Sequence, residues 1–109
     1  MTAYAVDENK NKVRIITELL SVSSIPAGGT AERSYGIGTA GEFFKNPEAV
    51  TVIASRNYWP ANFPITVEAG ITQTTVEGAI KYQATVKLHN LGDQTLDSAL
   101  VHLLLMGEV

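Results

Sequence analysis

Apolar and polar residues alternate with a period of two along much of the chain, a pattern typical of strands that bury one face. The alternation is cleanest in residues 79–91, AIKYQATVKLHNL, which predict a half-buried antiparallel strand. The side chains predicted to face the core are Ile80, Tyr82, Ala84, Val86 and Leu88, and those predicted to face water are Lys81, Gln83, Thr85, Lys87 and His89. Residues 65–76 alternate in the same way, with Ile65, Val67, Ala69 and Ile71 on one face.

Four further segments are apolar or β-branched enough to form strands: residues 13–22, 31–38, 49–56 and 98–109. A helix over residues 13–22 is conceivable, but the β-branched centre of this segment, IIT, favours a strand. Turn signals separate the segments, among them Pro26 with the Gly28-Gly29 pair, the Glu77-Gly78 pair and the sequence GDQTLD of residues 92–97.

Strands at this spacing, with little room for helix, predict an all-β fold. We expect an antiparallel β-sandwich of about six to seven strands, immunoglobulin-like or jelly-roll-like. Residues 13–109 are predicted to form this sandwich as a single domain. Residues 1–12 are mostly polar and are predicted to be a flexible N-terminal segment, while residues 42–45 are compatible with one helical turn.

The last predicted strand is apolar on both faces. One face of a strand in a two-layer sandwich usually points to water, so one of these faces is too apolar to stay exposed. Either a loop of the same chain covers that face or another subunit does. The first face holds Ala99, Val101, Leu103 and Leu105, and the second, a candidate oligomer interface, holds Leu100, His102, Leu104 and Met106.

The segment NYWPANFP, residues 57–64, holds the only Trp and two of the four Pro residues. The prolines prevent a central strand or helix and favour extended conformations before them, so a stiff loop is predicted. Aromatic side chains of this kind recur in docking surfaces and sugar-binding platforms. Three roles are open: plugging the end of the sandwich, docking a protein, or binding a ligand. The candidate binding residues are Asn57, Tyr58, Trp59, Asn62 and Phe63, with Tyr58 and Trp59 expected on an exposed or interfacial loop.

Composition narrows the classes of partner. Only 17% of the 109 residues are charged, and the net charge is -3 with no Lys/Arg cluster, which argues against nucleic-acid binding. The low charge instead favours a protein that buries surface against protein partners. There is no Cys, no signal-peptide pattern and no apolar run of membrane-spanning length. We therefore expect synthesis in the cytoplasm without membrane insertion.

One sequence motif, GIGTAG at residues 36–41, is a literal GxGxxG. A dinucleotide-binding unit would continue from it into a long helix, and Pro47 leaves no room for one, so a Gly-rich loop between strands is predicted. Asp93 and Asp97 are likewise expected to serve as turn residues, because the ligand spacing of a calcium loop is missing.

The titratable residues do not suggest a catalytic site, a metal site or a cofactor. His89 and His102 lack further ligands at zinc-site spacing, and His102, which lies among leucines, is expected to be buried or interfacial. The spacing of the possible acid pairs, Glu68 with Glu77 and Glu42 with Glu48, implies no common geometry. We therefore expect a protein without enzymatic activity.

Parts of the sequence resemble a known group of proteins. IPAGGTAERSYGI, residues 25–37, with the later VTVIAS of residues 50–55, resembles the Gly-rich turn and strands of small β-sandwich proteins in tailed-bacteriophage particles. Residues 82–108 resemble the closing hairpin of such sandwiches and of immunoglobulin-like adhesion modules. The resemblance implies a virion component without enzymatic activity, either a capsid decoration or head-fibre protein or a tail accessory protein. It also implies a homo-oligomer, often a homotrimer, that binds other virion proteins.

An alternative from a different functional class is a carbohydrate-binding, lectin-like module. In this hypothesis Tyr58 and Trp59 bind a host surface glycan, and Asn57 and Asn62 supply donors and acceptors for its hydroxyl groups.

Overall fold

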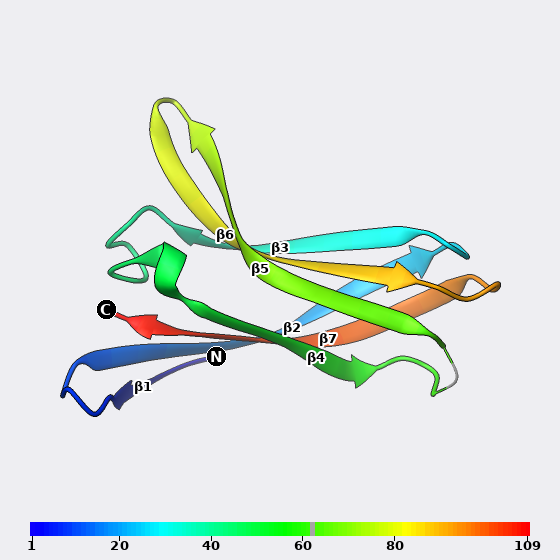
Figure 1. Ribbon diagram of the computed structural model, residues 1–109, viewed down its shortest axis with the longest axis horizontal. Coiled ribbons are helices and arrows are strands. Elements are labelled where there is room, and N and C mark those ends of the chain that lie inside the picture. Colours follow the sequence, from blue (N-terminus) through cyan, green and yellow to red (C-terminus); the bar gives the residue numbers. More distant parts are fainter. Residues whose placement is uncertain (62) are drawn as a thin grey trace.

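The computed structural model describes residues 1–61 and 63–109, in which the chain forms seven strands and one 3₁₀ helix (Figure 1). The strands are β1 (Thr2–Val6), β2 (Lys12–Ile25), β3 (Thr30–Gly38), β4 (Thr51–Tyr58), β5 (Ile65–Val76), β6 (Ala79–Asn90) and β7 (Leu96–Glu108). The 3₁₀ helix η1 (Pro47–Ala49) lies between β3 and β4. Within the described ranges, no helix is long and apolar enough to cross a membrane.

The strands form two antiparallel sheets around one core, which confirms the predicted β-sandwich. The four-stranded sheet has the order β1-β2-β7-β4, and the three-stranded sheet has the order β3-β6-β5. The pairing is nested along the chain, because β2 pairs with β7, β3 pairs with β6, and β4 contacts β5 where the two sheets meet. In the immunoglobulin order the fifth strand lies between the second and the fourth, whereas β7 takes this place here. The arrangement is therefore jelly-roll-like.

The core lies between the sheets and follows the predicted alternation over most of its length. In β6 the inward side chains of Ala84, Val86 and Leu88 are fully buried, as predicted. In β7 the buried face is Ala99, Val101, Leu103 and Leu105, also as predicted. The prediction is wrong for Ile80, which is 47% exposed because the β5–β6 hairpin bends away from the four-stranded sheet (Figure 1). The other apolar residues of the core cluster are Ile16, Leu20, Val22, Ile25, Ile37, Phe44, Val50, Trp59 and Leu96.

The N-terminal residues form a strand where a flexible segment was expected. Residues 2–6 form β1, which pairs with β2 from Thr2↔Ile16 to Val6↔Lys12. The amino group of Met1 also donates a hydrogen bond of 2.8 Å to the carbonyl of Thr17. All five side chains of β1 are exposed. An edge strand held by its backbone, with both faces in water, has no apolar alternation to reveal it in the sequence.

The connection between β3 and β4 closes one end of the sandwich. Residues 36–41 form the end of β3 and a turn rather than the start of a helix. The helical turn expected at residues 42–45 is absent, and η1 follows instead, with the Asn46 side chain accepting a hydrogen bond from the Glu48 amide. Phe44, in the middle of this connection, is fully buried and plugs the end of the core.

The molecule exposes more surface than a compact chain of its size. Its radius of gyration is 15.6 Å, whereas about 13 Å is typical for this length. Its accessible surface is 6559 Å², roughly 700 Å² more than the size scaling of folded monomers gives. The β5–β6 hairpin, which rises away from the two sheets in Figure 1, contributes to this excess.

Candidate functional site

The outward side of the four-stranded sheet carries the candidate oligomer interface. β7 is a central strand of this sheet, so Leu100, His102, Leu104 and Met106 lie in the middle of its outer surface. The register places Thr17 and Ile53 beside Leu104, and Leu19 and Ser55 beside His102. We call this surface the uncharged face; it comprises Ile15, Thr17, Leu19, Ser21, Thr51, Ile53, Ser55, Tyr58, Leu100, His102, Leu104 and Met106.

No Asp, Glu, Lys or Arg belongs to the uncharged face, which ends at Met106; Glu108 is the next residue on the same side of β7 and lies at the edge of this face. Leu19 is 49% exposed, Ile53 52% and Met106 40%, so no loop of the described chain covers these side chains. A depression of about 230 Å³ opens at the centre of the face, beside Ile53, His102 and Leu104. His102 was expected to be buried or interfacial; it is exposed in the single chain, which rules out burial within the chain and leaves the interfacial position as a prediction. Apolar surface exposed in this way is typical of a partner-binding surface.

A β-bulge in β4 separates the two aromatic residues expected to act together. The register of β4 against β7 shifts between Arg56 and Tyr58, so one extra residue, Asn57, enters the strand. Tyr58 consequently lies beside Leu100 on the uncharged face and is 58% exposed. Trp59 turns inward, is only 7% exposed and belongs to the core.

The expectation that Trp59 lies on an exposed or interfacial loop is therefore wrong, because the bulge reverses the alternation. The guanidinium of Arg56 lies 5.5 Å from the centre of the Trp59 ring and donates a hydrogen bond to the Trp59 carbonyl. Phe63 is half-buried against the core, and Asn57 is exposed. Asn62 lies outside the described residues. Trp59 and Phe63 thus plug the core, while Tyr58 is available to a partner.

The β5–β6 hairpin extends past the sandwich as a two-stranded arm, residues 73–81. The last pair between β3 and β6 joins Gly38 and Tyr82, so β6 has no neighbour other than β5 beyond that point. Every side chain of residues 72–81 is exposed. Glu77 (φ 51) and Gly78 (φ 81) form the predicted turn, and two positive φ values are typical of the tight hairpin turns that match strand twist.

At the base of the arm, Tyr82 contacts η1 of the opposite side of the sandwich. Its hydroxyl donates a hydrogen bond of 3.4 Å to Oε1 of Glu48. Burial and the Glu48 carboxylate raise the pKa of Tyr82 above its ordinary value of 10.0, so this hydroxyl remains a donor throughout the neutral range. The contact fixes the base of the arm relative to the rest of the molecule.

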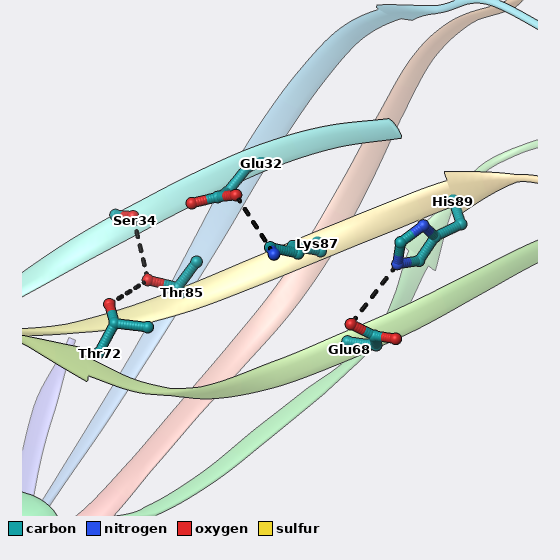
Figure 2. A network of polar contacts seen from close by, with 7 residues as sticks. All are labelled: Glu32, Ser34, Glu68, Thr72, Thr85, Lys87 and His89. Atoms are coloured by element: carbon teal, nitrogen blue, oxygen red, sulfur yellow. Dashed lines mark hydrogen bonds and ion pairs between the residues drawn. The ribbon is translucent and has the colours of Figure 1, made fainter. Parts of the chain in front are cut away.

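The outward side of the three-stranded sheet is polar, in contrast to the uncharged face. Figure 2 shows Thr85, which is only 6% exposed, with its hydroxyl 2.8 Å from that of Thr72 and 3.2 Å from that of Ser34. Lys87 lies 3.9 Å from Glu32, and Nε2 of His89 lies 3.5 Å from Oε2 of Glu68. Because Lys87 and Glu32 are both about half-exposed, their ion pair contributes little stability. This side of the molecule is suited to contact with water.

A cleft of about 380 Å³ lies at the open edge of the sandwich, between β1, β2, β3 and the connection that follows β3. We call it the edge cleft. Arg14 lies in it, with its Nη1 donating a hydrogen bond of 2.6 Å to the Phe43 carbonyl and its guanidinium 5.5 Å from the ring centre of Tyr4. Tyr35 and Glu42 complete the lining. The cleft combines aromatic rings with a cation and a carboxylate.

The other titratable residues considered in the sequence analysis do not come together in one site. His89 and His102 lie on the outer surfaces of different sheets, Glu68 pairs with His89, and Glu77 lies at the tip of the arm. Glu42 accepts a hydrogen bond from the Thr39 hydroxyl. Among the residues with a described structure, no group of three His, Asp or Glu side chains is close enough to hold a metal ion.

No family model, curated protein or solved structure matches this chain. Its function must therefore be inferred from its own surfaces and from the sequence resemblance.

Proposed function

We propose that this protein is a non-enzymatic structural component of a bacteriophage particle that acts by protein–protein assembly. In this role it is a capsid decoration or head-fibre protein or a tail accessory protein. It is made in the cytoplasm of the host. It then associates with further copies of itself, as a homotrimer in this proposal, and with other virion proteins.

The observation that carries this proposal is the uncharged face. A strand pattern that places Leu100, Leu104 and Met106 on the outside of a sheet is costly for an isolated protein, because exposed apolar surface favours association. The opposite side of the molecule, with its charged and hydroxyl side chains, shows that the sequence can make an outer sheet surface polar. Apolar side chains are thus concentrated on one outer surface of the two.

The size of the exposed surface also supports assembly. A stable interface commonly buries about 800 Å² on each partner. The excess of roughly 700 Å² over a compact monomer is of this size. An interface that buried this much surface would bring the exposed surface of each subunit close to the usual value.

Multi-angle light scattering of the purified protein tests the self-association. We expect the wild type to be oligomeric at tens of micromolar, and Ile53→Lys or Leu104→Glu to shift it to the monomer. Ile53→Lys is the cleaner variant because Ile53 is already half-exposed. Thr66→Glu, at an exposed position of β5, is the matched control and should leave the oligomer intact. A monodisperse wild-type monomer would remove the basis for this function.

The assignment to a virion rests on the resemblance of residues 25–37, 50–55 and 82–108 to small phage sandwich proteins. Mass spectrometry of purified phage particles tests it directly, and we expect the protein to be present at a fixed ratio to the major capsid or tail proteins. Capsid or tail genes on either side of its gene would support the same conclusion.

A second candidate function is carbohydrate binding. It is favoured by the edge cleft, in which Tyr4 and Tyr35 offer ring faces and Arg14 and Glu42 offer charged hydrogen-bonding groups. In this proposal the sugar binds in the edge cleft rather than at Tyr58 and Trp59, because the Trp59 ring is buried and not available for stacking. A glycan array compares the two functions: binding that is lost in Tyr4→Ala but kept in Tyr58→Ala would favour the lectin-like module.

A further inference from the structure

We infer that the arm of one copy, residues 73–81, packs on the uncharged face of a second copy. The inference rests on the proposed self-association and names the second surface that takes part in it.

The arm has one uncharged side that nothing in its own chain covers. Ile80 and Thr75 are directly paired, and both continue the inward face of the three-stranded sheet into the part of the hairpin that rises away from the opposing sheet. Ile80 is 47% exposed, although the alternation of β6 would place it in a core. The charged Lys81 lies on the other side of the arm, opposite Thr74. Ile80 therefore lies on the side of β6 that faces the core elsewhere in the strand, but here no other part of the described chain covers it.

The uncharged face offers a matching surface. Both surfaces lack charged side chains, so bringing them together leaves no charge buried without a partner. The depression beside Ile53, His102 and Leu104, about 230 Å³, has room for an aliphatic side chain such as that of Ile80. Exposed Ile53 and Leu19 on its rim provide further apolar contact.

A single chain cannot bring these two surfaces together. The arm extends from the three-stranded sheet and rises away from β2, β4 and β7, as Figure 1 shows. The uncharged face lies on the side of the four-stranded sheet that points away from the core. Each copy therefore has one arm to donate and one face to receive the arm of another copy.

The shape and the rigidity of the arm suit docking. The whole chain exposes roughly 700 Å² more than a compact monomer, and burial of the protruding arm in another copy would remove part of this excess. The arm is already ordered by its hairpin pairing and by the contact between Tyr82 and Glu48 at its base. A preformed arm loses little conformational entropy on docking.

A mixing experiment with two variants tests the inference. Ile80→Lys damages the arm, and Ile53→Lys damages the face. We expect each variant alone to weaken self-association by roughly tenfold or more, as for a residue at the centre of an interface. An equimolar mixture should recover association as a heterodimer, because the intact arm of Ile53→Lys can bind the intact face of Ile80→Lys, while the other arm and face of the pair stay blocked. Thr74→Lys, on the opposite side of the arm, is the matched control and should change the affinity by less than about twofold.

Three results distinguish the possibilities. Recovery in the mixture, measured by sedimentation velocity with one variant labelled, supports arm-to-face packing. If the wild type is oligomeric but Ile80→Lys associates normally, or if the mixture stays monomeric, this inference is overturned while the proposed assembly function stands. A monomeric wild type overturns both. Circular dichroism of each variant establishes that the fold is retained, which we expect because Ile53 and Ile80 are half-exposed.

Discussion

The side-chain amide of Asn90 donates a hydrogen bond of 3.1 Å to the backbone carbonyl of Ile25, and so joins the end of β6 in one sheet to the end of β2 in the other. The same amide donates to the Gln94 carbonyl at 2.8 Å, and its oxygen accepts from the Gly92 amide at 3.0 Å. Asn90 is fully buried. One polar side chain thus fixes the β6–β7 turn against both layers of the sandwich.

Replacing Asn90 tests this role. Asn90→Ala should lower the free energy of unfolding by about 2–4 kcal/mol, because several hydrogen bonds are lost and buried backbone groups are left without partners. Asn90→Asp, nearly equal in size, should also destabilise strongly, since a carboxylate cannot donate to the two carbonyls. Urea unfolding measures the change. Asn57→Ala, at an exposed position, should cost less than about 0.5 kcal/mol, and equal costs at both positions would contradict the proposed role.

The bulge at Asn57 predicts opposite behaviour for two adjacent aromatic residues. Trp59→Ala should cost about 3–5 kcal/mol of stability, as for other buried large side chains. Tyr58→Ala should change stability by no more than about 0.5 kcal/mol, because its ring is mostly exposed. If Tyr58 takes part in assembly, its variant should instead weaken oligomers. Thermal unfolding and light scattering on the same two variants separate these effects.

Gly107 is required by close packing at the plugged end of the core. A methyl group added there would lie 2.9 Å from Cδ1 of Phe44 and 3.0 Å from Cγ2 of Val50. Gly107→Ala should therefore destabilise by about 1–3 kcal/mol, the usual range for overpacking. Gly70→Ala is the control, since no atom lies within 4 Å of the corresponding position. Chemical denaturation should show no loss for Gly70→Ala, and similar losses for both would argue against a steric cause.

Replacing Thr85 tests whether the hydroxyl contacts on the outer surface of the three-stranded sheet contribute to stability. Thr85→Val keeps the size of the side chain but removes its contacts with Ser34 and Thr72. The expected cost is about 0.5–1.5 kcal/mol, because Ser34 and Thr72 are exposed enough to bind water instead. Thr74→Val in the exposed arm should be nearly neutral. A neutral Thr85→Val in urea unfolding would mean that these contacts contribute no net stability.

The strand pattern predicted the fold class because both sheets are half-buried for most of their length. Residues 84–88 and 99–105 alternate as they do in the structure, and the apolar second face of β7 correctly indicated an apolar outer sheet surface. Periodicity did not reveal β1, whose side chains are all exposed. Periodicity also could not show that the β5–β6 hairpin bends away from the opposing sheet, so Ile80 was wrongly predicted to face the core.

The candidate sites were harder to predict because they depend on pairing between distant strands. The aromatic character of residues 57–64 was visible, but the bulge that sends Tyr58 outward and Trp59 inward depends on the register with β7. Phe44 gave no periodic signal, since it lies in an irregular connection. The Gly and Asp residues at 92 and 93 marked a turn, yet nothing in the sequence distinguished Asn90 as the buried residue that organises it.

The nested pairing of the strands also sets an order of events during folding. β5 and β6 are joined by a two-residue turn and can pair locally, whereas β2 must wait for β7, whose Glu108 pairs with Val13. Contacts between residues so distant in sequence form slowly. The four-stranded sheet is therefore expected to close last, and the uncharged face, with β7 at its centre, is completed together with the core, because the inward side chains of β7 are part of that core. A nascent chain that lacks β7 also lacks Leu100, His102, Leu104 and Met106, and so it cannot present the complete uncharged face.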